Sequence, residues 1–187
     1  MIEMRGVRKR FEGGVEALAG LDLTISKGDL FGYIGPNGAG KSTTIKMLAT
    51  LEYPDEGEVR IAGVDVVERP EEVRRLIGYM PELFGLYDQM PVEEYLELFA
   101  RIYQVPLSQV DAVIELAGLE PKRQALCGTL SKGNRQRLYL ARILLHDPAV
   151  LLLDEPASGL DPLARIELRE LLKELHRMGK TILISSH

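Results

Sequence analysis

A glycine-rich segment limits the possible folds of this chain more than any other feature of its sequence. It follows the pattern G-x-x-x-x-G-K-[S/T], and its residues are Gly35, Pro36, Asn37, Gly38, Ala39, Gly40, Lys41, Ser42 and Thr43. Residues 30–34 before it predict a short buried strand, and residues 43–48 can begin a helix. A strand, a glycine loop and a helix in this order are typical of a loop that holds phosphate groups.

The residue types in this loop suit a triphosphate. Glycines carry no Cβ, so backbone N–H groups can close around phosphate oxygens, and the following helix adds the positive end of its dipole. Lys41 supplies a charge for the β- and γ-phosphates, and Ser42 offers a hydroxyl to Mg²⁺. The alternative is a glycine-rich turn with an incidental lysine, which the strand–loop–helix context disfavours.

Composition is compatible with one globular domain. The chain has 187 residues, of which 45% are hydrophobic and 27% charged. Its net charge of −5 gives no overall basic field that would recruit nucleic acid. The single cysteine, Cys127, rules out an internal disulfide, and we interpret it as a small apolar side chain. No run approaches the roughly 18 apolar residues of a membrane helix, so any spanning segment belongs to another chain.

Hydrophobic patterns indicate a helical block between two strand-rich blocks. Strands are predicted over residues 2–7, 15–25, 58–62 and 76–80, the first two as an antiparallel patch. Helices are predicted over residues 92–102, 110–117 and 131–145, with a further helix start at 70–72. The aromatic residues at helical spacing in the middle block are read as core. Buried strands at 149–153 and 181–184 then flank a helix over 162–177, and this alternation predicts a parallel α/β core.

Two carboxylates follow the apolar run at 149–153. Asp154 and Glu155 end this strand, and ligands of open parallel sheets bind at the carboxyl ends of the strands. We therefore expect the pair near the glycine loop. Asp154 can hold Mg²⁺, and Glu155 can orient and polarise the water that attacks a γ-phosphate. The alternative is an acidic helix cap, which the phosphate loop upstream disfavours.

With these motifs, the chain resembles the nucleotide-binding subunits of ABC transporters over essentially its whole length. Leu130-Ser131-Lys132-Gly133-Asn134, followed by Arg135-Gln136-Arg137, is similar to the family signature, usually LSGGQ. Residues 158–161 match the D-loop, residues 79–82 lie where the Q-loop belongs, and residues 186–187 match the switch histidine. Phosphate loops occur in many families, whereas the phosphate loop, signature and D-loop together are highly specific.

The resemblance implies an α/β fold: a P-loop NTPase core with a parallel sheet, a small antiparallel β patch and an inserted helical subdomain. It implies one ABC ATPase domain over residues 1–187, with the nucleotide-binding core in 1–82 and 148–187 and a helical signature subdomain in 83–147. The implied cofactors are ATP and Mg²⁺. The implied function is ATP binding and hydrolysis that powers a membrane exporter through ATP-driven dimerisation.

The resemblance also implies roles for single residues. Ser131 and Gly133 would contact the ATP held by the opposite subunit, and Phe11 would stack on adenine. The structural alternatives are a helix cap for Ser131 and a buried strand-end aromatic for Phe11. The implied catalytic residues are Lys41, Glu155 and His187. The implied metal ligands are Ser42, Glu82 and Asp154.

The implied partners are protein chains. One is a second ATP-binding subunit, arranged head to tail with two ATP molecules between the copies. The others are membrane-spanning permease subunits on a separate chain, which would dock over residues 82–95 and the helical block. The resemblance implies no nucleic-acid partner, and it implies a cytoplasmic protein held peripherally at the cytoplasmic face of the membrane.

The chain departs from the family pattern at three positions. Lys132 and Asn134 replace the usual Gly and Gln of the signature, while Ser131 and Gly133 are retained, so we expect a working site. Glu82 replaces the usual Gln, and its carboxylate can still meet Mg²⁺ or water. The Tyr-x-Pro-Glu motif and the signature lysine resemble the subgroup that drives ABC-2-type exporters, including multidrug exporters.

Two other functions remain open on the sequence. One is a soluble ABC ATPase that remodels nucleic acid or ribosomes, but the short spacing from Lys41 to Ser131 leaves no room for the long coiled coil of chromosome-maintenance relatives. The other is a nucleotide-binding regulatory module with little hydrolysis. Glu155 argues against this module, and the altered signature argues for it.

The chain stops at His187, whereas the family normally continues with further strands and helices. From this we expect a sheet edge left uncovered and a terminal carboxylate beside the γ-phosphate. Both lead to an expectation of weak ATPase activity and reduced stability at this length.

Overall fold

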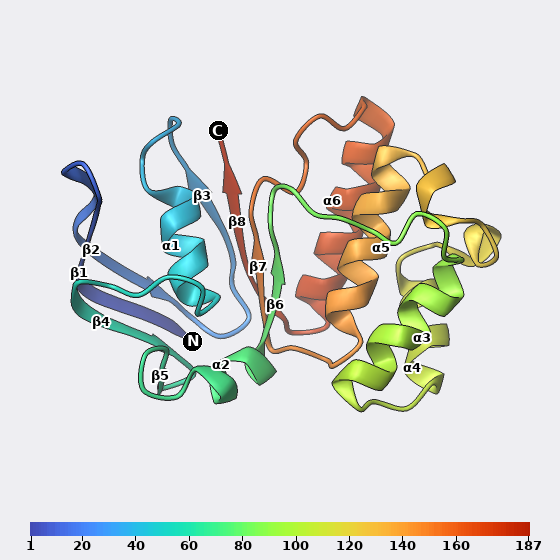
Figure 1. The fold of residues 1–187 in the computed structure, drawn as a ribbon, viewed down its shortest axis with the longest axis horizontal. Coiled ribbons are helices and arrows are strands. Elements are labelled where there is room, and N and C mark those ends of the chain that lie inside the picture. Colours follow the sequence, from blue (N-terminus) through green and yellow to red (C-terminus); the bar gives the residue numbers. More distant parts are fainter. The chain divides into compact units, whose positions relative to one another are not determined.

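A computed structural model describes all of residues 1–187, which form two four-stranded sheets and six α-helices (Figure 1). The strands are β1 (Ile2–Phe11), β2 (Val15–Ile25), β3 (Leu30–Ile34), β4 (Glu56–Ile61), β5 (Val64–Asp65), β6 (Ile77–Met80), β7 (Val150–Leu153) and β8 (Thr181–Ser186). The helices are α1 (Lys41–Leu48), α2 (Pro70–Leu76), α3 (Val92–Tyr103), α4 (Ser108–Leu116), α5 (Lys132–Leu144) and α6 (Pro162–Arg177). None of these helices is long and apolar enough to cross a membrane.

The parallel sheet positions the glycine loop and the carboxylates. Its strand order is β3-β8-β7-β6, so β8 lies between the strand before the loop and the strand before the carboxylates. Leu30 pairs with Ile182, and Leu153 pairs with Ile184, both in parallel register. The chain therefore leaves β3, β7 and β8 at the same edge of the sheet, where parallel α/β folds bind their ligands.

The antiparallel sheet has the strand order β2-β1-β4-β5. Its first two strands are the predicted patch, although β1 runs on to Phe11 instead of ending near residue 7. The short strand β5 was not predicted. It pairs with β4 through a two-residue hairpin at Ala62 and Gly63, both with positive φ, which is the tight turn that matches the twist of paired strands.

The chain divides into two compact units, which are described separately. Unit 1 comprises residues 1–79, 149–155 and 176–187, and unit 2 comprises residues 80–148 and 156–175. The sequence predicts residues 156–175 as part of the nucleotide-binding core, whereas the structure groups them with the helices of unit 2. The reason is close packing inside unit 2, because Arg137 of α5 pairs with Glu167 of α6 at 3.1 Å.

The core of unit 1 joins both of its sheets through α1. One continuous cluster contains buried side chains from each of these elements, among them Ile2, Ile25, Ile45, Leu48, Val59, Leu152 and Leu183. Burying one such aliphatic side chain contributes about 1.5–3 kcal/mol, so this cluster is the main force that holds the loop-bearing helix on the sheet.

Unit 2 packs helices around α5. The expectation that the aromatic helix positions are core is confirmed for Tyr95, which is almost fully buried together with Leu96. Ile102, which continues the same spacing, is exposed instead, because it lies in the last turn of α3 next to the chain reversal at Gln104. Burial raises the pKa of the Tyr95 phenol to about 12.

Candidate functional site

The glycine loop occupies the turn from β3 to α1, as the sequence pattern predicts. Gly40 lies at the N-cap of α1 with φ of +81°. A Cβ at this position would lie 2.5 Å from the Ala17 carbonyl oxygen and 2.7 Å from Leu18 Cδ2. Only glycine fits here, because both the left-handed backbone and the close approach to β2 exclude a side chain.

Lys41 begins α1 and turns its side chain back into the loop. Its ammonium donates to the carbonyl oxygens of Gly35 at 2.6 Å and Pro36 at 3.1 Å, and the residue is almost fully buried. The charge is thus held within the curve of the loop's own backbone, beside the N–H groups at the start of α1. A buried ammonium with only carbonyl partners forms an anion site of the kind expected from the motif.

Ser42 and Asp154 meet at the edge of the parallel sheet. The Ser42 hydroxyl donates to Asp154 Oδ1 at 3.2 Å, although the two residues are far apart in sequence. Asp154 is buried, and the same Oδ1 accepts a second hydrogen bond from the Ser185 hydroxyl at 2.6 Å. Hydroxyl and carboxylate oxygens are the hard donors that Mg²⁺ prefers.

Glu155 follows directly and has an unusual backbone. Its φ is +49°, a left-handed conformation that is rare for residues other than glycine, and its N–H donates to Ser185 Oγ at 2.9 Å. Its side chain is only 12% exposed, and its Oε2 lies 2.8 Å from His187 Nδ1. An ionised carboxylate only accepts, so the imidazole donates through Nδ1–H and presents Nε2 to the other side.

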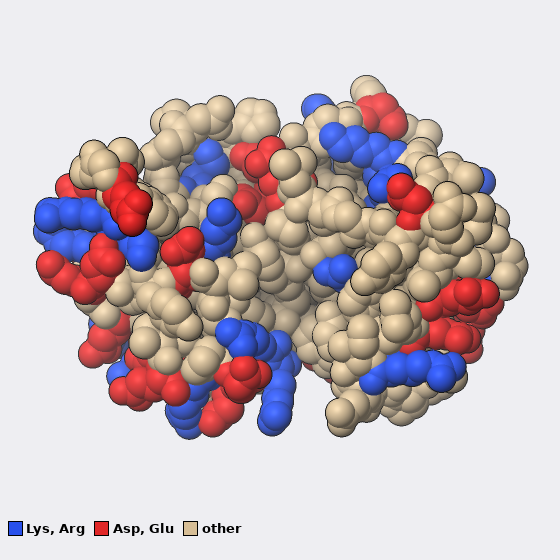
Figure 2. Space-filling view, viewed as in Figure 1, with Lys and Arg blue, Asp and Glu red and all other residues tan.

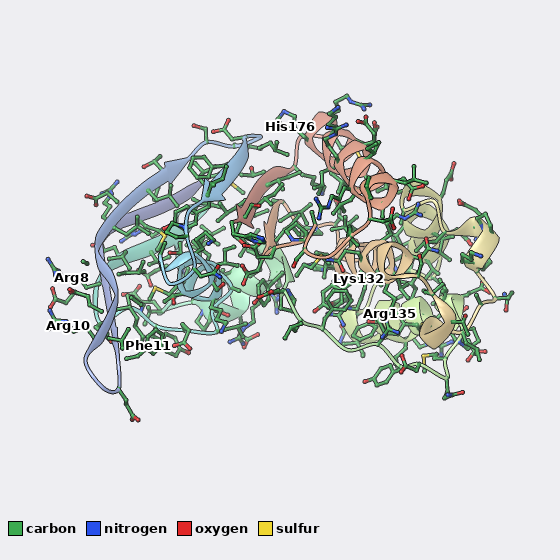
Figure 3. The ribbon with its side chains drawn as sticks, turned by 90° about the horizontal axis from the view of Figure 1, so that it is seen from above. Arg8, Arg10, Phe11, Lys132, Arg135 and His176 are labelled. Carbon is green, nitrogen blue, oxygen red and sulfur yellow. The ribbon has the colours of Figure 1, made fainter.

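Phe11 ends β1, next to the Gly13–Gly14 turn, and is 39% exposed. The Lys9 ammonium lies over its ring at 5.4 Å from the centroid. Arg8, Arg10 and Phe11 lie together at one end of the antiparallel sheet (Figure 3). The Arg10 N–H donates to Asp55 at 2.7 Å, and this bond lowers the pKa of the Asp55 carboxyl.

The signature segment lies in unit 2, at the start of α5 (Figure 3). Ser131 is the N-cap, and its hydroxyl accepts from the Asn134 N–H at 3.3 Å. Gly133 is buried, and a Cβ there would lie 2.8 Å from Ala164 Cβ on α6. The side chain of Lys132 crosses over Gly159, so the signature and the D-loop are packed together within this unit.

The structure brings some predicted site residues together and leaves others apart. Lys41, Ser42, Asp154, Glu155 and His187 form one connected set in unit 1. Glu82, Ser131 and Gly133 belong to unit 2. Sequence reasoning missed Ser185, which contacts both carboxylate residues; the available signal was a serine directly after the apolar run 181–184.

The fold and this connected set define a protein of the P-loop NTPase class, with an α/β core, an antiparallel sheet and a helical unit. Residues 18–158 match the ABC transporter family, and the chain belongs to that family.

Similar proteins carry names from the same family. The chain is 43% identical over 190 residues to the Nod factor export ATP-binding protein I of Burkholderia lata, and it is 39% identical over 198 residues to the ABC transporter ATP-binding protein NatA of Bacillus subtilis. All of this chain is covered in both matches, together with 62% of the first relative and 79% of the second. The chain therefore spans less than two thirds of the length of the export proteins that it matches.

Solved structures show the same fold. The chain is 29% identical, with a TM-score of 0.86, to the ATP-binding cassette MJ0796 in a dimeric post-hydrolysis state bound to ADP and Pi. This match covers 100% of this chain and 88% of that one. A structure described as the ATP-binding subunit of an ABC transporter gives a TM-score of 0.85 at 31% identity, over 100% of this chain and 79% of that one. The predicted fold class is confirmed by these matches.

Proposed function

We propose that this chain is the ATP-binding and ATP-hydrolysing part of an ABC-type membrane exporter. The observation that carries the proposal is the connected set at the edge of the parallel sheet, where the buried ammonium of Lys41, the Ser42–Asp154 pair and the Glu155–His187 pair adjoin one glycine loop. These are the charges and donors that phosphoryl transfer from a nucleotide to water requires.

Each residue of the set has one task in the proposed reaction. Lys41 exchanges its loop carbonyl partners for the β- and γ-phosphate oxygens. Glu155 orients and polarises the attacking water, and His187 holds the Glu155 carboxylate and reaches the γ-phosphate with its second nitrogen. Phe11 stacks on adenine with one face of its ring, while the Lys9 ammonium lies over the other face.

Ser42 and Asp154 fit the needs of Mg²⁺. They offer one hydroxyl and one carboxylate, and the described chain has no cluster of three or more acidic, cysteine or histidine residues that could hold a metal alone. Mg²⁺ bound to a nucleotide commonly takes one or two protein ligands and completes its shell with phosphate oxygens and water. When bound, the ion neutralises charge on the phosphates, and Glu82 is a further candidate ligand.

We propose that two copies act head to tail. Ser131 and Gly133 would then meet the nucleotide of the partner copy, with the Ser131 hydroxyl and the first N–H groups of α5 directed at its phosphate. The MJ0796 cassette is described as dimeric in its complex with ADP and Pi, which supports this arrangement.

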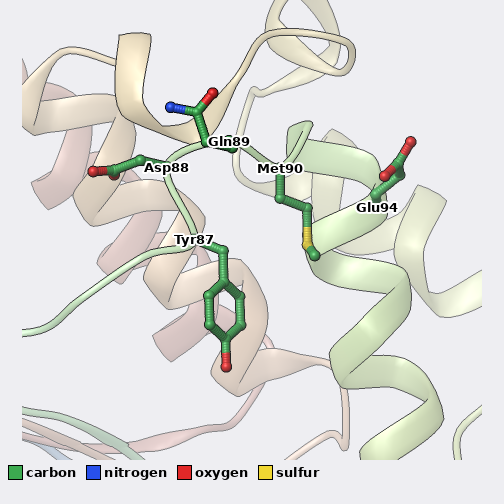
Figure 4. Close-up of a pocket in the computed structure, with 5 residues that line it drawn as sticks. All are labelled: Tyr87, Asp88, Gln89, Met90 and Glu94. Carbon is green, nitrogen blue, oxygen red and sulfur yellow. The ribbon is translucent and has the colours of Figure 1, made fainter.

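A surface hollow in unit 2 is the proposed docking place of a permease. It measures about 390 Å³ and is lined by Tyr87, Asp88, Gln89, Met90 and Glu94 (Figure 4). Leu83 nearby in sequence is 87% exposed. Asp88 pairs with Arg135 of α5 at 3.3 Å, so the hollow is joined to the helix that carries the signature.

The proposal places the protein at the cytoplasmic face of a membrane, where ATP is present and a permease on a separate chain can be reached. It includes no nucleic-acid partner. Acidic and basic side chains alternate over the surface, without a broad basic patch on the face seen in Figure 2, and the net charge is −5.

The test is Mg·ATP hydrolysis measured against protein concentration, with Glu155→Gln as the comparison. We expect turnover per molecule to rise steeply with concentration, as a dimeric site requires, and to fall about 10²–10⁴-fold in the variant, the usual contribution of a positioned base. Nucleotide binding should persist in the variant. ATP binding without turnover at any concentration would contradict the proposal and favour a regulatory module.

A further inference from the structure

Ser185 is a buried polar residue of unit 1 that no motif assigns. It is fully buried near the end of β8, where the neighbouring positions 182 and 183 are apolar core. A hydroxyl is retained in such surroundings only when its hydrogen bonds are satisfied. Its contacts therefore indicate what it does.

The Ser185 hydroxyl uses both its donor and its acceptor capacity on the carboxylate pair. Its proton is donated to Asp154 Oδ1 at 2.6 Å, and its oxygen accepts the Glu155 N–H at 2.9 Å. One side chain thus fixes the carboxylate of one residue and the backbone of the next.

The sheet topology makes this bridge possible. Strand β8 lies between β3 and β7, and its register pairs Tyr33 with Ser185 on one side and Leu153 with Ile184 on the other. Ser185 is therefore placed between the start of the glycine loop and the first residue after β7.

The hydrogen bond from the Glu155 N–H to Ser185 stabilises a left-handed backbone conformation that is unfavourable for glutamate. A glutamate with φ of +49° is costly, and such conformations persist where surrounding contacts determine them. The left-handed backbone turns the Glu155 side chain to meet His187 at 2.8 Å. Without the acceptor at Ser185, the partly buried Glu155 N–H would lose its partner, and the carboxylate would lose its fixed direction.

We infer that Ser185 is a positioning residue, which holds Asp154 for the metal–nucleotide complex and Glu155 for the attacking water. This inference rests on the proposed ATP hydrolysis. Ser185 itself touches neither nucleotide nor water in the mechanism and acts through its two neighbours.

The experiment compares the full chain with Ser185→Ala, Ser185→Thr and Ser26→Ala. The Ala variant should lower kcat about 10–100-fold, as loss of a supporting hydrogen bond around a metal site commonly does, with KM changed less than threefold. The Thr variant keeps the hydroxyl and should restore most of the turnover. Ser26 is an exposed serine of the same unit that belongs to no motif, so Ser26→Ala is the matched control and should stay within twofold of the original chain.

A binding measurement separates positioning from general damage. The affinity for a fluorescent ATP analogue in EDTA should be unchanged in Ser185→Ala, because the Lys41 loop is untouched. The gain in affinity on adding Mg²⁺ should shrink. In a Glu155→Gln background, Ser185→Ala should lower the remaining turnover less than it does in the original chain, since the part of its effect that acts through Glu155 is already lost.

Several outcomes would overturn the inference. They are unchanged kcat in Ser185→Ala, no rescue by threonine, or a full loss of turnover that persists in the Glu155→Gln background. If the Ala variant does not fold by circular dichroism, Ser185→Cys, a weak donor of similar size, replaces it with the same expectations. If the original chain hydrolyses ATP only as fast as Glu155→Gln, the proposed function itself fails, which this design distinguishes from failure of the role of Ser185.

Discussion

Replacing Gly133 with alanine tests why the signature needs a glycine. Gly133 lies in the first turn of α5, and the new Cβ would stand 2.8 Å from Ala164 Cβ on α6. Ordinary carbon–carbon contacts are about 3.5–4.0 Å. The two helices must therefore separate by close to an ångström, or the side chains around them must repack.

The expected loss of stability follows from two opposing terms. Overpacking of this kind costs about 1–3 kcal/mol. Alanine offsets up to about 1 kcal/mol of this through its better helix propensity. We therefore expect Gly133→Ala to lower the free energy of unfolding by up to about 2 kcal/mol.

The assay is urea unfolding followed by far-UV circular dichroism, without nucleotide, for both single variants and the double variant with Ala164→Gly. The double variant removes the clash, so the coupling energy between the sites should be about 1–3 kcal/mol. Gly85→Ala is the matched control, since a Cβ at Gly85 meets nothing within 4 Å, and it should change stability by less than about 0.5 kcal/mol. Additive effects of the two changes would refute the packing argument.

The same double variant separates packing from phosphate binding. If it regains stability and ATPase activity together, the glycine is required only by α6. If it regains stability but remains inactive, the glycine is also required by the approach of the partner's nucleotide.

Two further predictions concern the phosphate site and the helical unit. Lys41→Ala should weaken ATP binding itself, because it removes the only ammonium held inside the loop; equilibrium titration with an ATP analogue measures this, and unchanged affinity would remove Lys41 from the site. Tyr95 has a folded-state pKa raised by burial to about 12, against about 10 when unfolded, so its contribution to stability is complete below pH 10 and is lost as the pH rises towards 12. This shift in pKa corresponds to about 3 kcal/mol of stability. Tyr95→Phe should therefore reduce the fall of the urea midpoint between pH 10 and 12. An equal fall in the variant and in the original chain would contradict the assignment to Tyr95.

Local patterns in the sequence predicted most elements because local physics decides them. The short apolar runs before Asp154 and at 181–184 are typical of buried strands, and the glycine pattern favours a turn into a helix. The short strand β5 escaped prediction since two residues carry no periodicity. Its formation depends on the positive φ of Ala62, which alanine does not signal.

The contacts between distant segments were less predictable. Parallel strands were expected, but no pattern in 181–184 says that β8 inserts between β3 and β7. The roles of Ser185 and of the Gly133–Ala164 contact depend on that order and on helix packing. Hydrophobic periodicity predicts neither the strand order nor the helix packing. For the same reason it does not predict that residues 156–175 group with the helical unit.

The central place of β8 has a consequence for biosynthesis. Strand β3 is made early and has no other neighbour in its sheet, so on the ribosome it must wait for residues 181–186 before it can pair. The antiparallel sheet draws all its strands from residues 2–65 and can form long before. The nascent chain thus exposes the Leu30–Ile34 strand until those residues have been made, a period in which chaperone binding would protect it from aggregation.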